Sequence, residues 1–147
     1  MSQDTHFRRP ESVLVVVYTV AGEVLLLLRK QPLNFWQSVT GTLEWGESPA
    51  AAASRELCEE TGIGNAEIVD RRFSQRFPIL PNWRSRYAPD VEENLEHVFS
   101  AALPARVSVT LHPDEHTGLL WLPRDAAARK VWSWTNREAI LSVVRTT

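Results

Sequence analysis

The feature that most constrains this chain is a short helical segment between two glycine-marked loops. Ser48-Pro49 is a helix start signal, because serine can cap the first turn and proline at the first helical position loses no needed hydrogen bond. Ala50 to Thr61 consists mainly of strong helix formers, and Gly62 stands where a left-handed residue commonly ends a helix. The sequence therefore predicts a helix that ends at Thr61.

Three glutamates gather on one side of this helix. Residues three and four apart are neighbours on a helix, so Glu56 faces both Glu59 and Glu60. Each like-charge pair costs about 0.2–0.5 kcal/mol even in solvent. One interpretation is a solvated acidic face. The other is a site for Mg²⁺ or Mn²⁺, which bind carboxylates and would reverse the charge met by a polyanionic triphosphate.

The rest of the chain predicts a mixed α/β fold. Val13 to Tyr18 is almost wholly apolar and rich in β-branched residues, as in a strand buried on both faces. Other predicted strands cover residues 24–28, 37–40, 68–73, 96–103, 107–111 and 119–122. Short helices are expected at 123–129 and 135–145, the second capped by Thr135. We expect one domain over residues 1–147, with a mixed β-sheet sandwiched between helices (α/β/α).

The acidic helix should bury its opposite stripe against that sheet. Small or apolar residues occupy this stripe, namely Ala50, Ala53, Leu57 and Cys58.

Composition narrows the classes of partner and compartment. Sixteen basic and eighteen acidic residues give a net charge of −2, which argues against a nucleic-acid polymer as partner. The single cysteine, Cys58, forms no internal disulfide and suits a reducing cytoplasm. The first ten residues lack the apolar stretch of a signal peptide, and no apolar run is long enough to cross a membrane. We expect a cytoplasmic protein.

The helix and its preceding loop carry a family motif. Gly41 is followed after five residues by Glu47, and after seven more by Arg55-Glu56-Leu57-Cys58-Glu59-Glu60-Thr61-Gly62-Ile63. This spacing matches the Nudix box at every defined position, so the chain resembles the Nudix hydrolases. The resemblance implies a Nudix fold and a Mg²⁺-dependent (or Mn²⁺-dependent) pyrophosphohydrolase.

The resemblance also implies roles for the residues of the box. Glu56, Glu59 and Glu60 are expected to bind the metal, and Glu56 also to orient or deprotonate the attacking water. Glu47 would support the metal's water ligands or pair with Arg55, whose expected role is that ion pair. The carbonyl of Thr40 is a further metal ligand in this interpretation, with its hydroxyl idle.

An additional acid is expected from a loop distant in sequence. We expect Glu115 to be this acid, as a metal ligand or general base, with Asp114 as the alternative. The structural interpretation is that Glu115 is an ordinary loop carboxylate without a catalytic role. His112 and His116 flank this pair, but two histidines in a polar loop are weak evidence, and both are left out of the predicted site.

Longer matches point to one bacterial subgroup. They are Arg8-Arg9-Pro10, Phe35 to Gly41, Arg86-Tyr87-Ala88-Pro89 and Ser133 to Arg137. They resemble the dihydroneopterin triphosphate pyrophosphatases, also described as dATP pyrophosphohydrolases, which remove pyrophosphate on the way to folate.

The subgroup implies substrate contacts beyond the box. They are expected from Arg8, Arg29, Thr40, Phe77, Pro78, Ile79, Leu80 and Ser133. The structural alternative for Arg8 and Arg29 is a solvated surface arginine, and for Ser133 it is a helix cap. Trp36 is expected to anchor the core.

Other functions fit the same motif. Alternatives are a hydrolase that cleans the nucleotide pool, a dinucleoside polyphosphate hydrolase and a non-catalytic nucleotide-binding module, against which the intact box argues. We expect a small-molecule triphosphate as ligand and a monomer or weak homodimer. The residues do not distinguish a pterin from a purine, or fix the phosphorus attacked and the number of metals.

Overall fold

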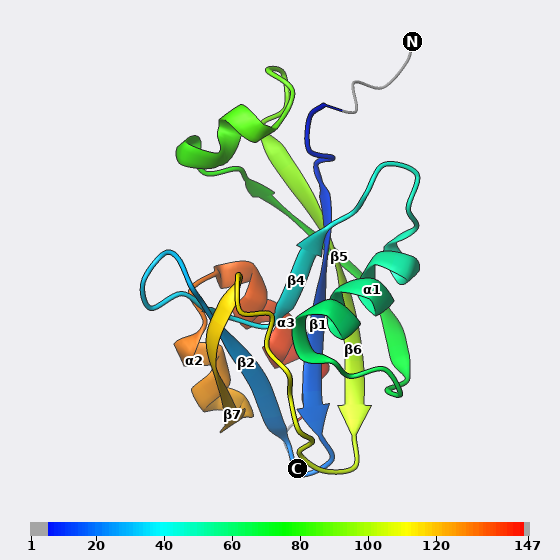
Figure 1. The fold of residues 1–147 in the computed structure, drawn as a ribbon. Coiled ribbons are helices and arrows are strands. Elements are labelled where there is room, and N and C mark those ends of the chain that lie inside the picture. The colour runs from blue at the N-terminus through cyan, green and yellow to red at the C-terminus, as the bar shows by residue number, and fades with distance from the viewer. Residues whose placement is uncertain (1–5, 146–147) are drawn as a thin grey trace.

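The computed structural model describes residues 6–145 (Figure 1). Residues 1–5 lie outside the described residues. They are half of the ten N-terminal residues for which no signal peptide is predicted. The strands are β1 (Glu11–Thr19), β2 (Glu23–Arg29), β3 (Trp36–Gln37), β4 (Val39–Thr42), β5 (Ile68–Pro78), β6 (Glu93–Leu103) and β7 (His116–Pro123). The helices are α1 (Pro49–Thr61), α2 (Arg124–Lys130) and α3 (Trp134–Val143), with a 3₁₀ helix η1 (Pro81–Arg86).

Strand β1 is the centre of a mixed sheet. The sheet runs in the order β3-β2-β1-β6-β5, with β4 also paired to β1 and β7 to β2. β1 is parallel to β6 and antiparallel to β2 and β4. Val13 and Val15 pack into one core cluster, while Leu14 and Val16 pack into the other. The prediction that this strand is buried on both faces is confirmed.

Helices cover both faces of the sheet, as Figure 1 shows. α1 packs into the first core cluster through residues such as Ala53 and Leu57. α2 and α3 pack into the second cluster through residues such as Ala128 and Ile140. The predicted α/β/α arrangement is therefore confirmed. Among residues 6–145, no helix combines the length and apolar character that crossing a bilayer requires.

The buried stripe of α1 is rotated from the predicted one. Ala53 and Leu57 are buried as expected, but Ala50 and Cys58 are exposed and Glu60 is 1% exposed. A stripe centred on positions 53, 57 and 60 carries Glu60 inward at the end of the helix, because residues three and four apart share a face. One acidic side chain thus points into the molecule.

The predicted strand at 107–111 is wrong. This segment has no strand assignment and crosses the end of α1, where the Thr110 amide donates to the Thr61 carbonyl at 2.9 Å. Val109 and Leu111 pack against the first core cluster. Its alternating apolar residues thus reflect packing on a core without a neighbouring strand, a distinction that alternation alone cannot make.

Of the two caps expected for the last helix, Ser133 is confirmed and Thr135 is wrong. α3 begins at Trp134, and the side chain of Ser133 accepts hydrogen bonds from the amides of Thr135 and Asn136. Thr135 is instead buried inside the first turn. The serine, two residues earlier, takes the cap because it has the extended backbone that a capping residue needs.

Candidate active site

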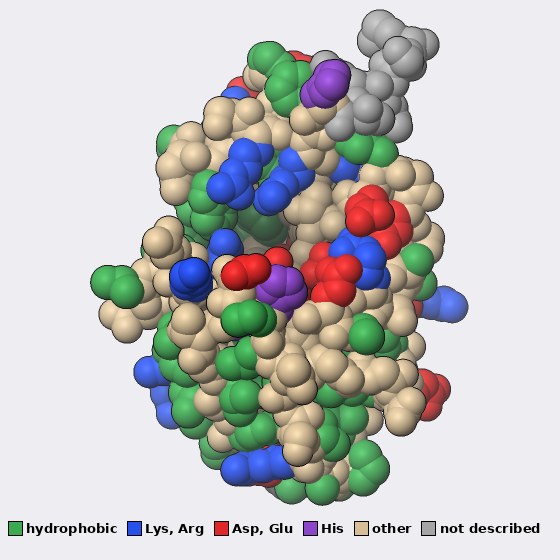
Figure 2. Space-filling view, in the orientation of Figure 1, with side chains coloured by type: hydrophobic (Ala, Val, Ile, Leu, Met, Phe, Trp, Pro, Cys, Tyr) green, Lys and Arg blue, Asp and Glu red, His purple; other side chains and the backbone are tan. Residues whose placement is uncertain are grey.

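A cavity of about 920 Å³ opens at the part of β1 that pairs with β4 and β6, and its lining includes Ser12, Thr40 and Glu96. Figure 2 shows it as a hollow with basic side chains along one rim and acidic ones, with a histidine, along the other. Its charged lining includes Arg8, Arg29, Arg55, Glu56, Glu60, Arg86, Glu96, Asp114 and Glu115. An anion and a cation can therefore both be held in one hollow.

Glu60 is the most unusual of these residues. Its side chain is buried, and neither carboxylate oxygen has a hydrogen-bond partner among the described residues. Burial, together with the nearby Glu56 and Glu115, raises the pKa of this carboxyl well above its usual range. A buried carboxylate without a hydrogen-bond donor is destabilising, and a bound cation would offset that cost.

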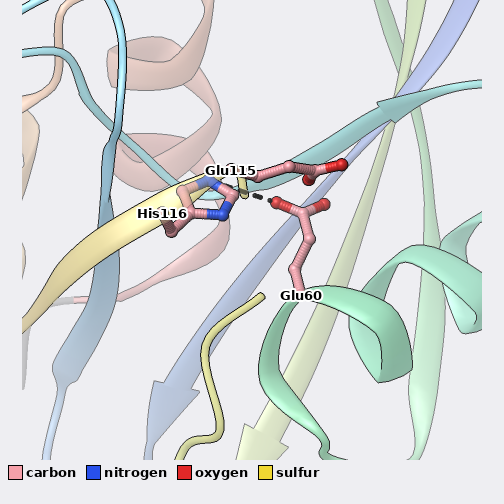
Figure 3. A group of neighbouring side chains, drawn as sticks. All are labelled: Glu60, Glu115 and His116. Atoms are coloured by element: carbon pink, nitrogen blue, oxygen red, sulfur yellow. Dashed lines mark ion pairs between the residues drawn. The ribbon is translucent and has the colours of Figure 1, made fainter. Parts of the chain in front are cut away.

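Glu115 and His116, at the start of β7, lie next to Glu60 at the end of α1 (Figure 3). One ligand atom from each of the three residues lies within 4.8 Å of the other two. The Glu115 carbonyl accepts from the Lys30 amide at 2.8 Å, and a bulge between Leu28 and Arg29 shifts the pairing of β2 with β7. Bulges commonly re-aim side chains beside active sites, and this one lies where Arg29 pairs with His116.

Glu56 approaches the backbone of the glycine loop. A Cβ atom on Gly41 would lie 2.1 Å from the Glu56 Cδ, so no other residue fits at this position without displacing the carboxylate. Burial raises the pKa of Glu56, and the hydrogen bond and positive charge of Arg55 oppose that shift. The orphaned oxygens of Glu60, with Glu56 and Glu115 on the same cavity, fit a divalent cation that prefers oxygen ligands.

Arg55 holds the acidic residues of the box in place. Its guanidinium makes two hydrogen bonds to Glu47, both at 2.8 Å, and one to Glu56 at 2.7 Å. It also donates to the Thr42 carbonyl at 3.2 Å. The hydrogen bonds from Arg55 lower the pKa of Glu47 to about 2. Arg55 thus lies where an ion-pair partner of Glu47 is expected.

Two of the predicted metal ligands, Glu59 and Thr40, do not point a free side-chain oxygen into the cavity. Glu59 is exposed, lies 3.3 Å from Arg55 and does not line the cavity. Thr40 does line it, and its hydroxyl donates to the Val13 carbonyl at 2.9 Å. That hydrogen bond occupies the hydroxyl and helps fix the strand whose end carries Gly41.

Three arginines share the basic rim. Arg8 and Arg29 line the cavity as predicted, and Arg86 joins them because the Arg8 amide donates to the Arg86 carbonyl at 2.7 Å. Burial and the neighbouring charge of Arg86 lower the pKa of Arg29. Arg86 was not among the predicted site residues, although it belongs to the motif Arg86-Tyr87-Ala88-Pro89, a few residues after the predicted substrate-lining segment.

The apolar wall comes from the segments expected to contact substrate. Phe77 to Leu80 and Ser133 all line the cavity. Phe35 stacks on Trp132 with ring centroids 4.7 Å apart, while Trp36 packs against the second core cluster as predicted.

His116 was missed by the sequence analysis. It is 3% exposed, its Nε2 lies 3.5 Å from Glu60, and burial lowers its pKa to about 4. A neutral imidazole can act as a metal ligand or hold Glu60. Its position as the first residue of a strand carried no signal that separates it from His112.

Comparison with known proteins places this site in a family. The NUDIX domain model matches residues 8–143. The chain belongs to the Nudix family. It is 40% identical to dihydroneopterin triphosphate diphosphatase of Escherichia coli over 143 residues, 94% of each chain. The enzyme of that name from Haemophilus influenzae is 37% identical over 91% of this chain and 87% of its own.

Solved structures agree with the fold. The structure of the E. coli dihydroneopterin triphosphate pyrophosphohydrolase superposes with a TM-score of 0.87 at 40% identity, over 94% of this chain and 97% of that one. A Nudix hydrolase from Listeria monocytogenes shares the fold alone, at 21% identity and a TM-score of 0.75 over 92% of both chains. This Nudix hydrolase thus carries an intact box on the expected fold.

Proposed function

We propose that this Nudix hydrolase converts dihydroneopterin triphosphate, and dATP-like nucleoside triphosphates, to the monophosphate and pyrophosphate, a step on the way to folate. The observation that carries the proposal is Glu60, a buried carboxylate without a hydrogen-bond donor among the described residues, which lies next to Glu115 in a cavity that three arginines also line. The substrate is chosen from the relatives that share 40% and 37% identity over most of the chain.

The chain's own residues divide the work of hydrolysis. Arg8, Arg29 and Arg86 bind the phosphate oxygens and align the triphosphate along the cavity. A water molecule attacks the α- or β-phosphorus, the bridging P–O bond between them breaks, and the leaving phosphate group takes the bonding electron pair, so that monophosphate and pyrophosphate form. The water's proton passes to a carboxylate of the cavity, either Glu56, which Arg55 orients, or Glu115.

Mg²⁺, or Mn²⁺, would be held by Glu56, Glu60 and Glu115, with Glu59, the Thr40 carbonyl and His116 as additional ligands. When bound, the ion neutralises phosphate charge and lowers the pKa of a bound water.

Variants of Glu56 and Glu60 test the chemistry. With Mg²⁺, wild-type protein should release pyrophosphate from dihydroneopterin triphosphate, and EDTA should stop it. Glu56→Gln and Glu60→Gln should each lower kcat by about 100-fold or more, because each removes a charge that acts in the reaction. Glu67→Gln, at an exposed position, serves as the control. Folded Gln variants that turn over at the wild-type rate would contradict the proposal.

Metal binding has a readout that does not depend on turnover. Mg²⁺ or Mn²⁺ should raise the Tm of the wild type, because a ligand that binds only the folded state stabilises it. The same ions should leave the Tm of Glu60→Gln nearly unchanged. Equal shifts in both proteins would place the ion elsewhere.

A further inference from the structure

A second buried carboxylate, Glu96, lies in the same cavity on a different part of the sheet. It is on β6, where it pairs with Ser12 of β1 and with Gln75 of β5. Its side chain is 4% exposed and lines the cavity, and its Oε1 has no hydrogen-bond partner among residues 6–145. The hydrolytic mechanism does not use it.

Two polar side chains near Glu96, Asn94 and Gln75, are engaged elsewhere. Asn94 donates to the Ser12 hydroxyl at 2.7 Å, and Gln75 donates to the Thr135 carbonyl at 2.9 Å. The Thr135 hydroxyl supports the charged form of Glu96, but burial dominates and raises the pKa of this carboxyl to about 7. A buried carboxylate oxygen without a donor is destabilising, and a ligand that supplied N–H donors would offset that cost.

The surroundings of Glu96 suit the flat end of a substrate. Leu14 and Phe77 lie on the same face of the sheet as Glu96, because strand residues two apart, and their in-register partners, share a face. Both line the cavity and supply apolar surface beside the carboxylate.

Glu96 lies a short distance across the sheet from Gly41 and the acidic helix, where the phosphates are expected to bind. Thr42 of β4 pairs with Ser12, which pairs with Glu96, so two strand spacings, about 10 Å, separate Glu96 from the glycine loop. A triphosphate at the acidic helix, joined to a ring by a short polyol or sugar, would span this separation.

We propose that Glu96 determines ring specificity by accepting two hydrogen bonds from the amino group and adjacent ring N–H of a 2-amino-4-oxo ring, the edge shared by pterin and guanine. This inference rests on the proposed function. Adenine presents a different edge, in which an amino donor stands beside a ring-nitrogen acceptor. A charged carboxylate satisfies the pterin edge fully and the adenine edge only in part.

The variant Glu96→Gln tests this assignment. Glutamine has the same shape but offers one acceptor and one donor, which matches adenine better than pterin. We expect kcat/KM for dihydroneopterin triphosphate to fall about 10- to 100-fold, mainly through KM, as expected for a lost bidentate contact. The value for dATP should change less than about 3-fold, since one acceptor is retained. Glu93→Gln, an exposed position on the same strand, is the matched control.

A purely structural role would lower the Tm or lower both kcat/KM values by the same factor, and an unchanged substrate ratio would overturn the inference. If wild-type protein fails to turn over either triphosphate, the proposed function itself fails, and the two failures are distinguishable.

A comparison of ligands needs no variant. dGTP and dITP differ only in the 2-amino group, so their inhibition constants against dihydroneopterin triphosphate report on that contact. We expect dGTP to inhibit the wild type at least about 5-fold more tightly, because the amino group donates to Glu96. Equal constants would contradict the assignment.

Discussion

Gly41 shows at the residue scale how the backbone fixes a functional side chain. The Glu56 carboxylate occupies the space that a Cβ on Gly41 would need, at 2.1 Å from its Cδ. Gly41→Ala should displace Glu56 and lower kcat by about 100-fold, since misplacements of about 1 Å have that effect. Gly64→Ala is the control, because nothing lies within 4 Å of its added Cβ. Equal activity in the two variants would show that Glu56 need not hold this position.

The ion pair of Glu47 with Arg55 gives stability a defined pH dependence. Arg55 lowers the pKa of Glu47 from 4.5 to about 2 in the folded state. The stability from this pair is therefore fully present above pH 4.5 and is lost as the pH falls towards 2. The free energy of unfolding of Glu47→Gln should lie below that of the wild type at pH 6, with the gap closing by pH 2. Urea titrations across this range measure it, and a gap independent of pH would be contrary to this account.

At the scale of elements, helix α1 depends on its first turn. The Ser48 side chain accepts from the Ala51 amide at 3.1 Å, and Pro49 occupies the first helical position. Ser48→Ala should cost about 1 kcal/mol of stability, the usual value for a lost N-cap. Ser85→Ala, at an exposed position outside α1, provides the comparison. Chemical denaturation of both variants would show whether the cap contributes as expected.

The elements also show what local sequence can and cannot predict. The start and end of α1 and the two-sided burial of β1 follow from capping residues and an apolar run, which act over a few positions. The segment 107–111 and the role of His116 depend on contacts between distant segments, such as Thr110 with Thr61 and His116 with Glu60. Such contacts leave no local pattern.

At the scale of the whole molecule, basic and acidic residues are separated on the two rims of the cavity, although the net charge of the chain is small. Sixteen basic and eighteen acidic residues give a net charge of −2, yet arginines line one rim of the cavity and glutamates the other. The acidic box was predictable because its residues are close in sequence. Arg8 and Arg29 of the basic rim were expected from the family resemblance, whereas Arg86 and Glu96 were not predicted as site residues, because only the fold brings their segments to the cavity.

The most direct test of the account compares kcat/KM for four substrates with Mg²⁺: dihydroneopterin triphosphate, dATP, 8-oxo-dGTP and diadenosine tetraphosphate. We predict that the pterin triphosphate ranks first, with pyrophosphate as a product, in line with the relatives at 40% and 37% identity. It should rank above dATP because its ring edge matches Glu96 better than adenine does. If dihydroneopterin triphosphate ranks last, the substrate assignment is contradicted, whereas hydrolysis of none of the four would contradict the proposed chemistry itself.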